Sequence, residues 1–221
     1  MPVCNEAKIL VERLRALQTM RRAGHQLIVV DGNSDDGSYE LAAPLCDRLL
    51  QSVPNRARQM NLGAAAAQGD LLLFLHADTC LPEDCISQLE AAFLNPQFIW
   101  GRFDVRLSDH DWRYRIIEKS MNWRSRLTAV ATGDQAIFVR RASFERLGGF
   151  APIALMEDVE LSKRLRRIAR PYCLKSQVLV SARRWQQQGI VATILVMWWL
   201  RLLYLGGVAP EKLLQIYSKD R

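Results

Sequence analysis

The sequence predicts an α/β protein in which helices cover a mostly parallel sheet. Short apolar runs alternate with amphipathic segments, the connections between them are short, and the 221 residues are 49% hydrophobic and 24% charged. A chain of this composition can bury a sizeable core, and its length fits one domain of ordinary size. We expect a main domain over residues 1–185, followed by an apolar and basic helical segment over residues 186–221.

The first half of the chain alternates regularly between helices and strands. An apolar stripe that includes Leu10 and Leu14 predicts a helix over residues 6–22. The β-branched run at 27–30 ends at the turn sequence Asp-Gly-Asn-Ser, so it is predicted to be a strand. The fully apolar run at 71–75 indicates a strand buried on both faces. Weaker signals complete this half: a strand at 49–50, a helix at 54–68 closed by a Gly-Asp pair, and a helix opened by Pro82.

The second half is less regular, and no linker divides it. Residues 98–107 are typical of a long strand, and a basic, aromatic helix is expected over 111–126. A short strand follows at 135–139. A strongly charged helix is expected over 157–168, and a last strand at 178–181.

Acidic residues stand where two of the predicted strands end, which is where ligands bind in open parallel sheets. Asp31 closes the strand at 27–30 and could face a sugar hydroxyl or a base edge, although taken alone an ordinary Asx-capped turn is the better explanation. Asp78 follows the strand at 71–75. It could hold a hard divalent cation or simply cap the next helix.

Two adjacent carboxylates, Glu157 and Asp158, open a predicted helix. They could complement the helix dipole, or one of them could act as a general base. Each of these signals is weak alone, but their order and spacing along the chain are specific together. In chain order, the series is Pro2, Asn5, Glu6, Asp31, Ser34, Asp36, Arg58, Asn61, His76, Asp78, Gly133, Asp134, Gln135, Glu157 and Asp158.

This series resembles the inverting nucleotide-sugar glycosyltransferases of family two, which have the Rossmann-like GT-A fold. The resemblance covers roughly residues 1–185. The stretches at 73–79 and 155–161 look most like a small bacterial subgroup, the selenodomain-associated transferase 2 or arsenosugar-type enzymes. The resemblance implies a metal-dependent inverting transfer of a sugar from a nucleotide-diphosphate donor to an acceptor hydroxyl, and it does not specify the acceptor.

The resemblance also implies a role for each matched residue. Asp158 matches the catalytic base, with Glu157 beside it, and Asp78 matches the last acid of the D-x-D motif, which binds Mn²⁺ or Mg²⁺. The other matched residues are implied to bind the donor: Pro2, Asn5 and Glu6 in the loop after the first strand, Asp31 at the base with Ser34 and Asp36 in its turn, Arg58 and Asn61 beside the nucleotide and diphosphate, and His76, Gly133, Asp134 and Gln135.

The sequence departs from the family pattern in two places. His76 replaces the first acid of D-x-D, where a neutral imidazole could donate to a hydroxyl or ligate a softer metal such as Mn²⁺. The chain also starts at Met1-Pro2, so the apolar first strand that precedes this loop in the family is missing. We expect either a true start upstream or a truncated first strand.

Charge and cysteine content bear on location. Residues 161–221 hold twelve Lys and Arg against two acids, whereas residues 1–160 carry a net charge of −3. The five cysteines form no C-x-x-C pair and no signal peptide is present, so we expect a reducing, cytoplasmic location. No helix-turn-helix, zinc or RNP-type motif accompanies the basic residues, so no nucleic-acid partner is expected.

The segment 189–207 is apolar, and its single charge is Arg201. Its uninterrupted run is too short to span a bilayer, which needs about 20 residues. With Trp198 and Trp199 it favours a helix lying in the cytoplasmic membrane interface, at the inner face of the membrane, with the active site near a membrane-proximal acceptor. A buried helix, packed on the sheet or on a second subunit, and a spanning helix remain alternatives.

Two other functions remain open from the sequence. A nucleotidyltransferase would share the sheet, but it needs a glycine-rich phosphate loop, and residues 2–6 form no such loop. A non-catalytic protein that binds the membrane surface would also explain the apolar and basic C-terminal quarter.

Overall fold

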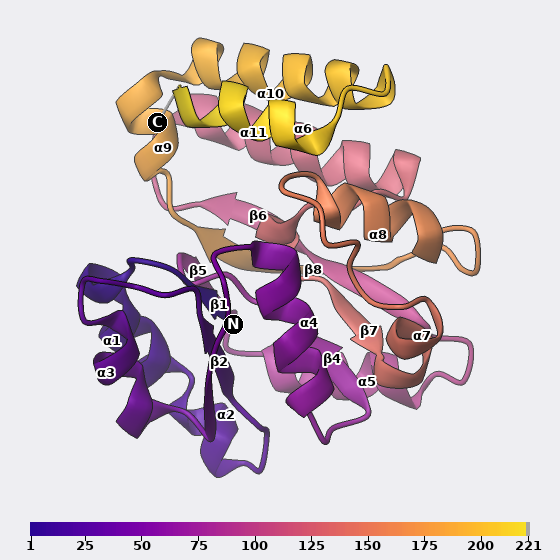
Figure 1. Ribbon diagram of the computed structural model, residues 1–221. Coiled ribbons are helices and arrows are strands. Elements are labelled where there is room, and N and C mark those ends of the chain that lie inside the picture. The colour runs from indigo at the N-terminus through magenta and orange to yellow at the C-terminus, as the bar shows by residue number, and fades with distance from the viewer. Residues whose placement is uncertain (220–221) are drawn as a thin grey trace.

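The computed structural model describes residues 1–219 and confirms the expected α/β class (Figure 1). The first of two sheets is parallel, in the order β1-β2-β3. Its strands are β1 (Pro2–Val3), β2 (Ile28–Asp31) and β3 (Arg48–Gln51). Pro2 lies in the strand opposite Val30 and is buried, so the expectation that it belongs to the following loop is corrected.

Helices cover both faces of this sheet. α1 and α3 pack on one face, where Leu10 and Leu14 meet Val29 in a small core. α4 packs on the other face, and its buried Gln59 donates to the carbonyls of Val3 and Val30 at 2.8 and 2.9 Å. The helices are α1 (Ala7–Ala16), α2 (Gln18–Arg22), α3 (Ser38–Ala42) and α4 (Arg56–Ala66), and a 3₁₀ turn covers Ala43–Leu45. The single helix expected over 6–22 is therefore two helices that meet at Leu17.

The second sheet is mixed, in the order β4-β7-β6-β8-β5. β6 and β8 run parallel, whereas β4–β7, β6–β7 and β5–β8 are antiparallel pairs. A mostly parallel arrangement therefore holds for the first sheet and for β6–β8 only. The strands are β4 (Leu71–Leu73), β5 (Thr79–Cys80), β6 (Trp100–Leu107), β7 (Phe138–Arg140) and β8 (Tyr172–Val180).

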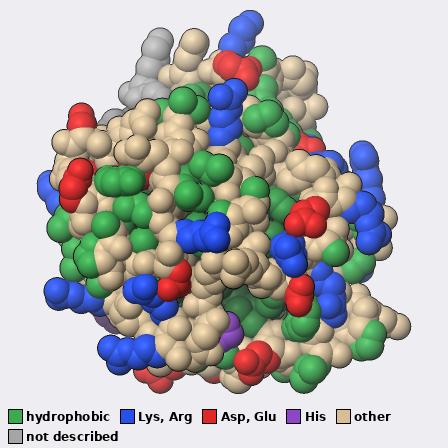
Figure 2. Space-filling model, turned by 60° about the horizontal axis from the view of Figure 1, so that its bottom comes forward, with side chains coloured by type: hydrophobic (Ala, Val, Ile, Leu, Met, Phe, Trp, Pro, Cys, Tyr) green, Lys and Arg blue, Asp and Glu red, His purple; other side chains and the backbone are tan. Residues whose placement is uncertain are grey.

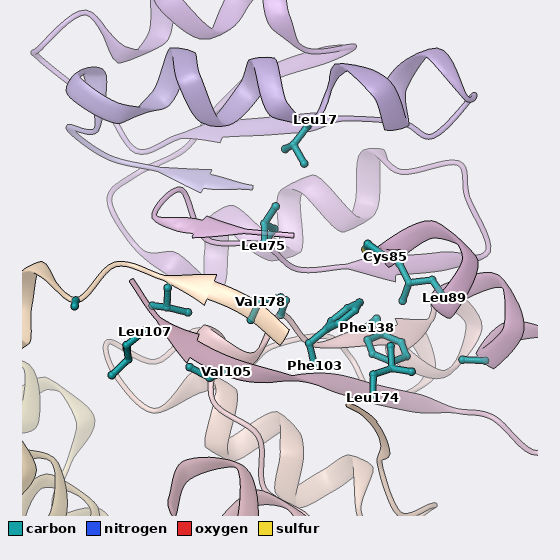
Figure 3. Close-up of a cluster of buried hydrophobic side chains, with 14 of the residues drawn as sticks. Leu17, Leu75, Cys85, Leu89, Phe103, Val105, Leu107, Phe138, Leu174 and Val178 are labelled. Carbon is teal, nitrogen blue, oxygen red and sulfur yellow. The ribbon is translucent and has the colours of Figure 1, made fainter. Parts of the chain in front are cut away.

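The largest core lies between the second sheet and its helices. Phe103, Val105, Phe138 and Val178 meet there, with Leu75 above them (Figure 3). A second core joins α4 to β6 through Phe74, Trp100 and Leu161, so α4 connects the two sheets. The covering helices are α5 (Cys85–Leu94), α6 (Trp112–Thr128), α7 (Arg141–Arg146) and α8 (Glu157–Leu165), and a 3₁₀ turn, η2, covers Gly133–Gln135.

Three C-terminal helices end the described chain: α9 (Arg183–Gln188), α10 (Ile190–Leu205) and α11 (Pro210–Lys219). α10 and α11 lie side by side (Figure 1). The buried Leu200 and Leu213 pack against Val130, just after α6, and against Met156 and Val159 at the start of α8. Within residues 1–219, no helix is both long enough and apolar enough to cross a membrane.

Candidate functional site

Two neighbouring loops of the first sheet are joined by hydrogen bonds. The loop after β1 contributes Asn5, whose backbone N–H donates to the Ser34 hydroxyl at 2.9 Å and whose side-chain oxygen accepts from the Asp35 N–H at 3.0 Å. The Glu6 N–H donates to the Ser38 hydroxyl at 3.0 Å. The structure thus brings the predicted donor-binding residues of both loops together at the carboxyl end of the sheet.

The carboxylates of these loops are used within the loops themselves. Asp31 is only 1% exposed, and both of its oxygens accept from Ser34. Asp36 accepts the Ala7 N–H at the start of α1, at 2.9 Å, and hydrogen bonds from Ser38 and then Ala7 lower its pKa. These acids shape the loops, and a contact between Asp31 and a base stays a prediction.

α4 presents two of the predicted residues in different ways. Arg58 is exposed on this helix. The side-chain amide of Asn61 is fully engaged, because it donates to the Phe150 carbonyl and accepts from the Phe150 N–H, both at 2.8 Å. Asn61 therefore fastens α4 to the loop after α7.

A second group of predicted residues surrounds His76, which follows β4. His76 Nδ1 lies 3.7 Å from Asp134 Oδ1. The ring packs so tightly on Gly133 that a side chain there would place its Cβ 2.3 Å from His76 Cε1. Burial opposes ionisation of Asp134, but His76, Arg56 and Arg201 outweigh it and lower the Asp134 pKa. Gln135 is fully buried, and its side-chain oxygen accepts the Thr132 N–H at 3.2 Å.

The acid pair opens α8 beside this group. Met156, which precedes it, has a left-handed φ of 69°, which is uncommon for a residue other than glycine. Asp158 is half-buried, and its two carboxylate oxygens accept the N–H groups of Gly133 at 2.7 Å and Val159 at 2.6 Å. Glu157 is buried, and burial followed by the charge of Asp158 raises its pKa.

His76, Gly133, Glu157 and Asp158 line one small hollow of about 10 Å³. The rest of its lining is apolar: Met60, Phe74, Ile137 and Phe150. This volume corresponds to about one water molecule. Four of the residues matched by the family resemblance therefore lie together, although 82 positions separate His76 from Asp158. Their roles in donor binding and catalysis stay predictions.

The surroundings of Asp78 bear on its predicted role as a metal ligand. Its side chain is half-buried, and the one hydrogen bond that it accepts within residues 1–219 comes from the Thr79 hydroxyl, at a long 3.4 Å from Oδ1. Within the described residues, no group of three or more His, Cys, Asp or Glu side chains forms a metal cage. An available carboxylate without a cage fits Mg²⁺-type binding, in which substrate phosphates complete the coordination.

Sequence reasoning missed three arginines of the site. Arg56 Nη1 lies 4.0 Å from Glu157 Oε1; burial acts to lower the pKa of Arg56, but Glu157 and the other nearby acids raise it overall. Arg124 on α6 and Arg201 on α10 both interact with the charge of Asp158. The sequence signals only Arg201, as the one charge of an apolar run, and it gives no motif for the other two.

The basic residues after position 160 are only partly free to meet a membrane. Arg164 binds Glu160 and the carbonyls of Leu147 and Gly149. Arg166 and Arg170 donate to backbone carbonyls at 3.0 and 3.2 Å. Figure 2 shows one face of the molecule, on which basic and acidic side chains are interspersed with hydrophobic ones. Three arginines of the basic run are therefore held by contacts within the fold.

Comparison with solved structures identifies the fold. TarS from S. aureus, also solved with UDP and with UDP-GlcNAc, superposes with a TM-score of 0.67 at 15% identity, covering 83% of this chain and 59% of that one. The mannosyltransferase PcManGT from Pyrobaculum calidifontis, solved with GDP-Man and Mn²⁺, gives 0.61 at 19% identity, covering 99% and 68%. This chain thus spans less than two thirds of the length of TarS.

A search of curated proteins found no match to the sequence. Residues 1–148 match the sequence model of the family described as "Glycosyl transferase family 2". This range includes all of the predicted donor-binding residues, from Pro2 to Gln135. The match covers more than half of the chain, and the GT-A fold agrees with it. The chain therefore belongs to glycosyl transferase family 2.

Proposed function

We propose that the protein is a metal-dependent inverting glycosyltransferase that moves a sugar from a nucleotide-diphosphate donor to an acceptor hydroxyl. One observation carries the proposal: the half-buried carboxylate of Asp158 is fixed by the Gly133 N–H at 2.7 Å, beside the His76–Asp134 pair. The stretches at 73–79 and 155–161 support membership of the bacterial selenodomain-associated transferase 2 subgroup as part of this proposal.

Asp158 would act as the general base. Each of its oxygens already accepts one backbone N–H, which fixes the carboxylate while leaving lone pairs for a hydroxyl proton. Glu157 lies beside it with a raised pKa, and its protonated form would spare Asp158 the repulsion of a second buried charge. With one base, the acceptor oxygen displaces the diphosphate in a single step, and the anomeric configuration inverts.

Asp78 would hold Mn²⁺ or Mg²⁺ together with the donor diphosphate, since its carboxylate is available and the described part of the chain forms no competing cage of His, Cys, Asp or Glu side chains. The bound ion would offset the charge of the departing diphosphate. His76 cannot supply a carboxylate at the first position of the motif. It would orient the donor through its contact with Asp134.

The outer face of α10 supports a peripheral contact with an anionic membrane surface, as at the cytoplasmic inner face. Its large side chains are all more than half exposed: Val191, Leu195, Trp198, Trp199, Leu202 and Leu205. Exposed apolar faces rimmed by tryptophan suit the interface between headgroups and acyl chains. Such docking would bring the site to a membrane-proximal acceptor.

The enzymatic proposal is tested by donor turnover. The protein is incubated with UDP-GlcNAc, other UDP-sugars and GDP-mannose, with Mn²⁺, with Mg²⁺ or with EDTA, and release of the nucleoside diphosphate is measured. We expect metal-dependent release from one donor, and NMR of the transferred sugar should show the inverted anomer. Release that is equally fast in EDTA would contradict metal dependence, and no release from any donor would contradict the proposed activity.

A further inference from the structure

The helix α6 is apolar on two faces. Its inner face packs Tyr114 and Ile117 into the largest core. Its outer face carries a row of four large side chains that are 57–69% exposed: Trp112, Ile116, Trp123 and Leu127. Because they stand at i, i+4, i+11 and i+15, they form one stripe along the helix, which we call the α6 ridge. Single exposed apolar residues are normal on a soluble surface, whereas an apolar stripe with two tryptophans marks a contact surface.

A polar hollow of about 350 Å³ borders the α6 ridge. It lies between α6 and the strands β6 and β8, and it is lined by Arg106, Arg115, Glu118, Lys119, Asn122 and Gln177. Lys119 stands seven residues after Trp112 and four before Trp123, so it lies on the ridge side of the helix. The hollow and the ridge therefore form one surface, the α6 surface.

Three of the side chains that line the hollow are fixed by hydrogen bonds. The buried Asn122 donates to the Val105 carbonyl at 3.0 Å and accepts the Val105 N–H at 2.8 Å. The buried Glu118 accepts the Leu107 N–H at 2.6 Å, and the same oxygen pairs with Arg115 at 3.0 Å. Arg115 also donates to the Leu107 carbonyl at 3.2 Å. These contacts set the shape of the hollow before any ligand binds.

Two cations of the hollow are left without a counter-charge. Arg106 and Lys119 are exposed, and neither forms an ion pair or a side-chain hydrogen bond with another residue of the described range 1–219. Glu118 is the only acid among the six lining residues, and Arg115 neutralises it. The hollow therefore presents two uncompensated positive charges beside an apolar ridge.

This combination of features indicates the ligand. A basic hollow alone would accept any small anion, and an apolar ridge alone would accept any apolar partner. An anionic phospholipid satisfies both, because its charged phosphate is joined to apolar chains. Guanidinium and ammonium groups bind phosphate, and tryptophan suits the boundary between headgroups and acyl chains. A second copy of this chain is disfavoured, because a two-fold contact would bring the same uncompensated cations together.

We propose that the α6 surface binds the headgroup layer of a membrane, with Arg106 and Lys119 on the phosphate of an anionic phospholipid and the α6 ridge in the interface. The inference goes beyond the proposed function, because it assigns a lipid site to a helix other than α10 and does not depend on donor turnover. Ile190 and Ile194 of α10 pack on the same core as the inner face of α6, and both helices lie on one side of the second sheet (Figure 1). One membrane could therefore contact both helices.

Co-sedimentation of the full chain with vesicles tests the charged half of the α6 surface. The vesicles contain phosphatidylcholine, with or without phosphatidylglycerol. We expect Arg106→Gln combined with Lys119→Gln to weaken binding to phosphatidylglycerol vesicles at least tenfold, and to leave binding to phosphatidylcholine alone unchanged, because that surface carries no net charge.

The matched control removes two exposed charges elsewhere. Lys8→Gln on α1 combined with Arg48→Gln on β3 lowers the net charge by the same amount and should bind like the wild type. Equal losses in the two double variants would show a general attraction of the basic protein to the vesicle, which would overturn the headgroup site.

Trp112→Ser combined with Trp123→Ser tests the apolar half. This variant should weaken binding to both kinds of vesicle more than tenfold, whereas Leu94→Ser, at another exposed apolar position, should not. All of these side chains are exposed, so the variants should melt at the temperature of the wild type. Wild-type binding by either α6 double variant, or no binding of the wild type to phosphatidylglycerol vesicles, would overturn the proposal.

Two further outcomes would assign the surface elsewhere. Loss of binding in Trp198→Ser combined with Trp199→Ser, with both α6 double variants at the wild-type level, would leave the membrane contact to α10 and overturn the α6 site. A lipid-free dimer that dissociates in Trp112→Ser combined with Trp123→Ser, measured by analytical ultracentrifugation, would assign the ridge to a second copy and also overturn it. Failure of donor turnover would contradict the proposed enzyme without changing any of these results.

Discussion

Asp158 has the geometry of a fixed but accessible base. Substitution by Asn keeps the size of the side chain and an oxygen that can accept the Gly133 N–H, so the fold should be preserved. We predict that Asp158→Asn lowers turnover by about 10²-fold or more, because a proton acceptor is lost, and leaves the donor Kd nearly unchanged. Steady-state kinetics and calorimetric titration of the donor measure the two quantities.

A control on the same helix separates loss of the base from loss of charge. Glu160→Gln removes an acid two residues away, one that binds Arg164 rather than the site. Its turnover should stay within a few-fold of the wild type. Full turnover in Asp158→Asn would show that another group accepts the proton.

The raised pKa of Glu157 has a consequence for stability. The folded protein holds the proton of the Glu157 carboxyl more tightly than the unfolded chain does. Between the ordinary glutamate pKa of about 4.3 and the raised pKa, the folded state therefore binds more protons than the unfolded state. Stability therefore falls as the pH rises through the window between the ordinary and the raised pKa. We predict that Glu157→Gln is free of this loss of stability. The melting temperature of the variant should therefore rise relative to that of the wild type as the pH increases through this window.

Thermal unfolding between about pH 4 and pH 8 measures the effect. Glu90→Gln, which alters an exposed glutamate on α5, should run parallel to the wild type at every pH. A constant difference between Glu157→Gln and the wild type across the range would contradict the shifted titration.

At the scale of elements, local signals in the sequence identified most helices. α4 and α6 begin within two residues of their expected starts because Asn55 and Asp111 cap them, each accepting a backbone N–H at 2.9 Å. The sequence did not predict that β7 inserts antiparallel between β4 and β6. Strand pairing depends on partners distant along the chain, and a three-residue strand such as β7 carries too short a pattern to reveal them.

The sequence predicted only some of the residues that the structure places at the candidate site. The structure brings His76, Asp134 and Asp158 together from the end of β4, the η2 turn and the start of α8. The roles that the family resemblance gives them stay predictions. The sequence singled out Arg201 only as the one charge of an apolar run, and it gave no signal for Arg124, because a long basic side chain on a helix is usually solvated. The packing of α10 on the start of α8, which puts Arg201 near the site, joins segments that are distant along the chain.

The η2 turn depends on the absence of a side chain at Gly133. A Cβ there would lie 2.3 Å from His76 Cε1 and 2.6 Å from His76 Nε2, so the imidazole must move away from Asp134. We predict that Gly133→Ala costs about 1–3 kcal/mol of stability and lowers turnover at least tenfold. Gly69→Ala, whose Cβ would meet only the Leu71 carbonyl oxygen at 3.7 Å, is the matched control and should change neither. Unchanged turnover in Gly133→Ala would show that the His76 position is not needed.

For the whole molecule, α10 connects the site to the surface. Its inner face places Leu200 in a core with Leu213. Burial lowers the pKa of the neighbouring Arg201, and the charges of Asp158 and Asp134 act against that shift. Lys163 on α8 lies over the ring of Tyr204, 4.7 Å from its centre, which ties the same face to the acid-bearing helix. Because this helix completes a core as well as a surface, deletion of residues 189–207 would unfold part of the site. Substitution of outer residues is therefore the sharper test of membrane contact.

Trp198 and Trp199 are 64% and 56% exposed on the outer face of α10. If each indole buries on the order of 100 Å² in the interface, it contributes about 2.5 kcal/mol to binding. We predict that the protein co-sediments with vesicles that contain anionic lipid, and that Trp198→Ser combined with Trp199→Ser weakens this binding more than tenfold. Leu94→Ser, at an 80% exposed leucine on α5, should bind like the wild type.

Rising salt should weaken binding only modestly, because several arginines of the basic run are held within the fold. Absence of binding at low salt, or equal binding by the double variant, would exclude α10 as a membrane contact and leave its outer face to another partner.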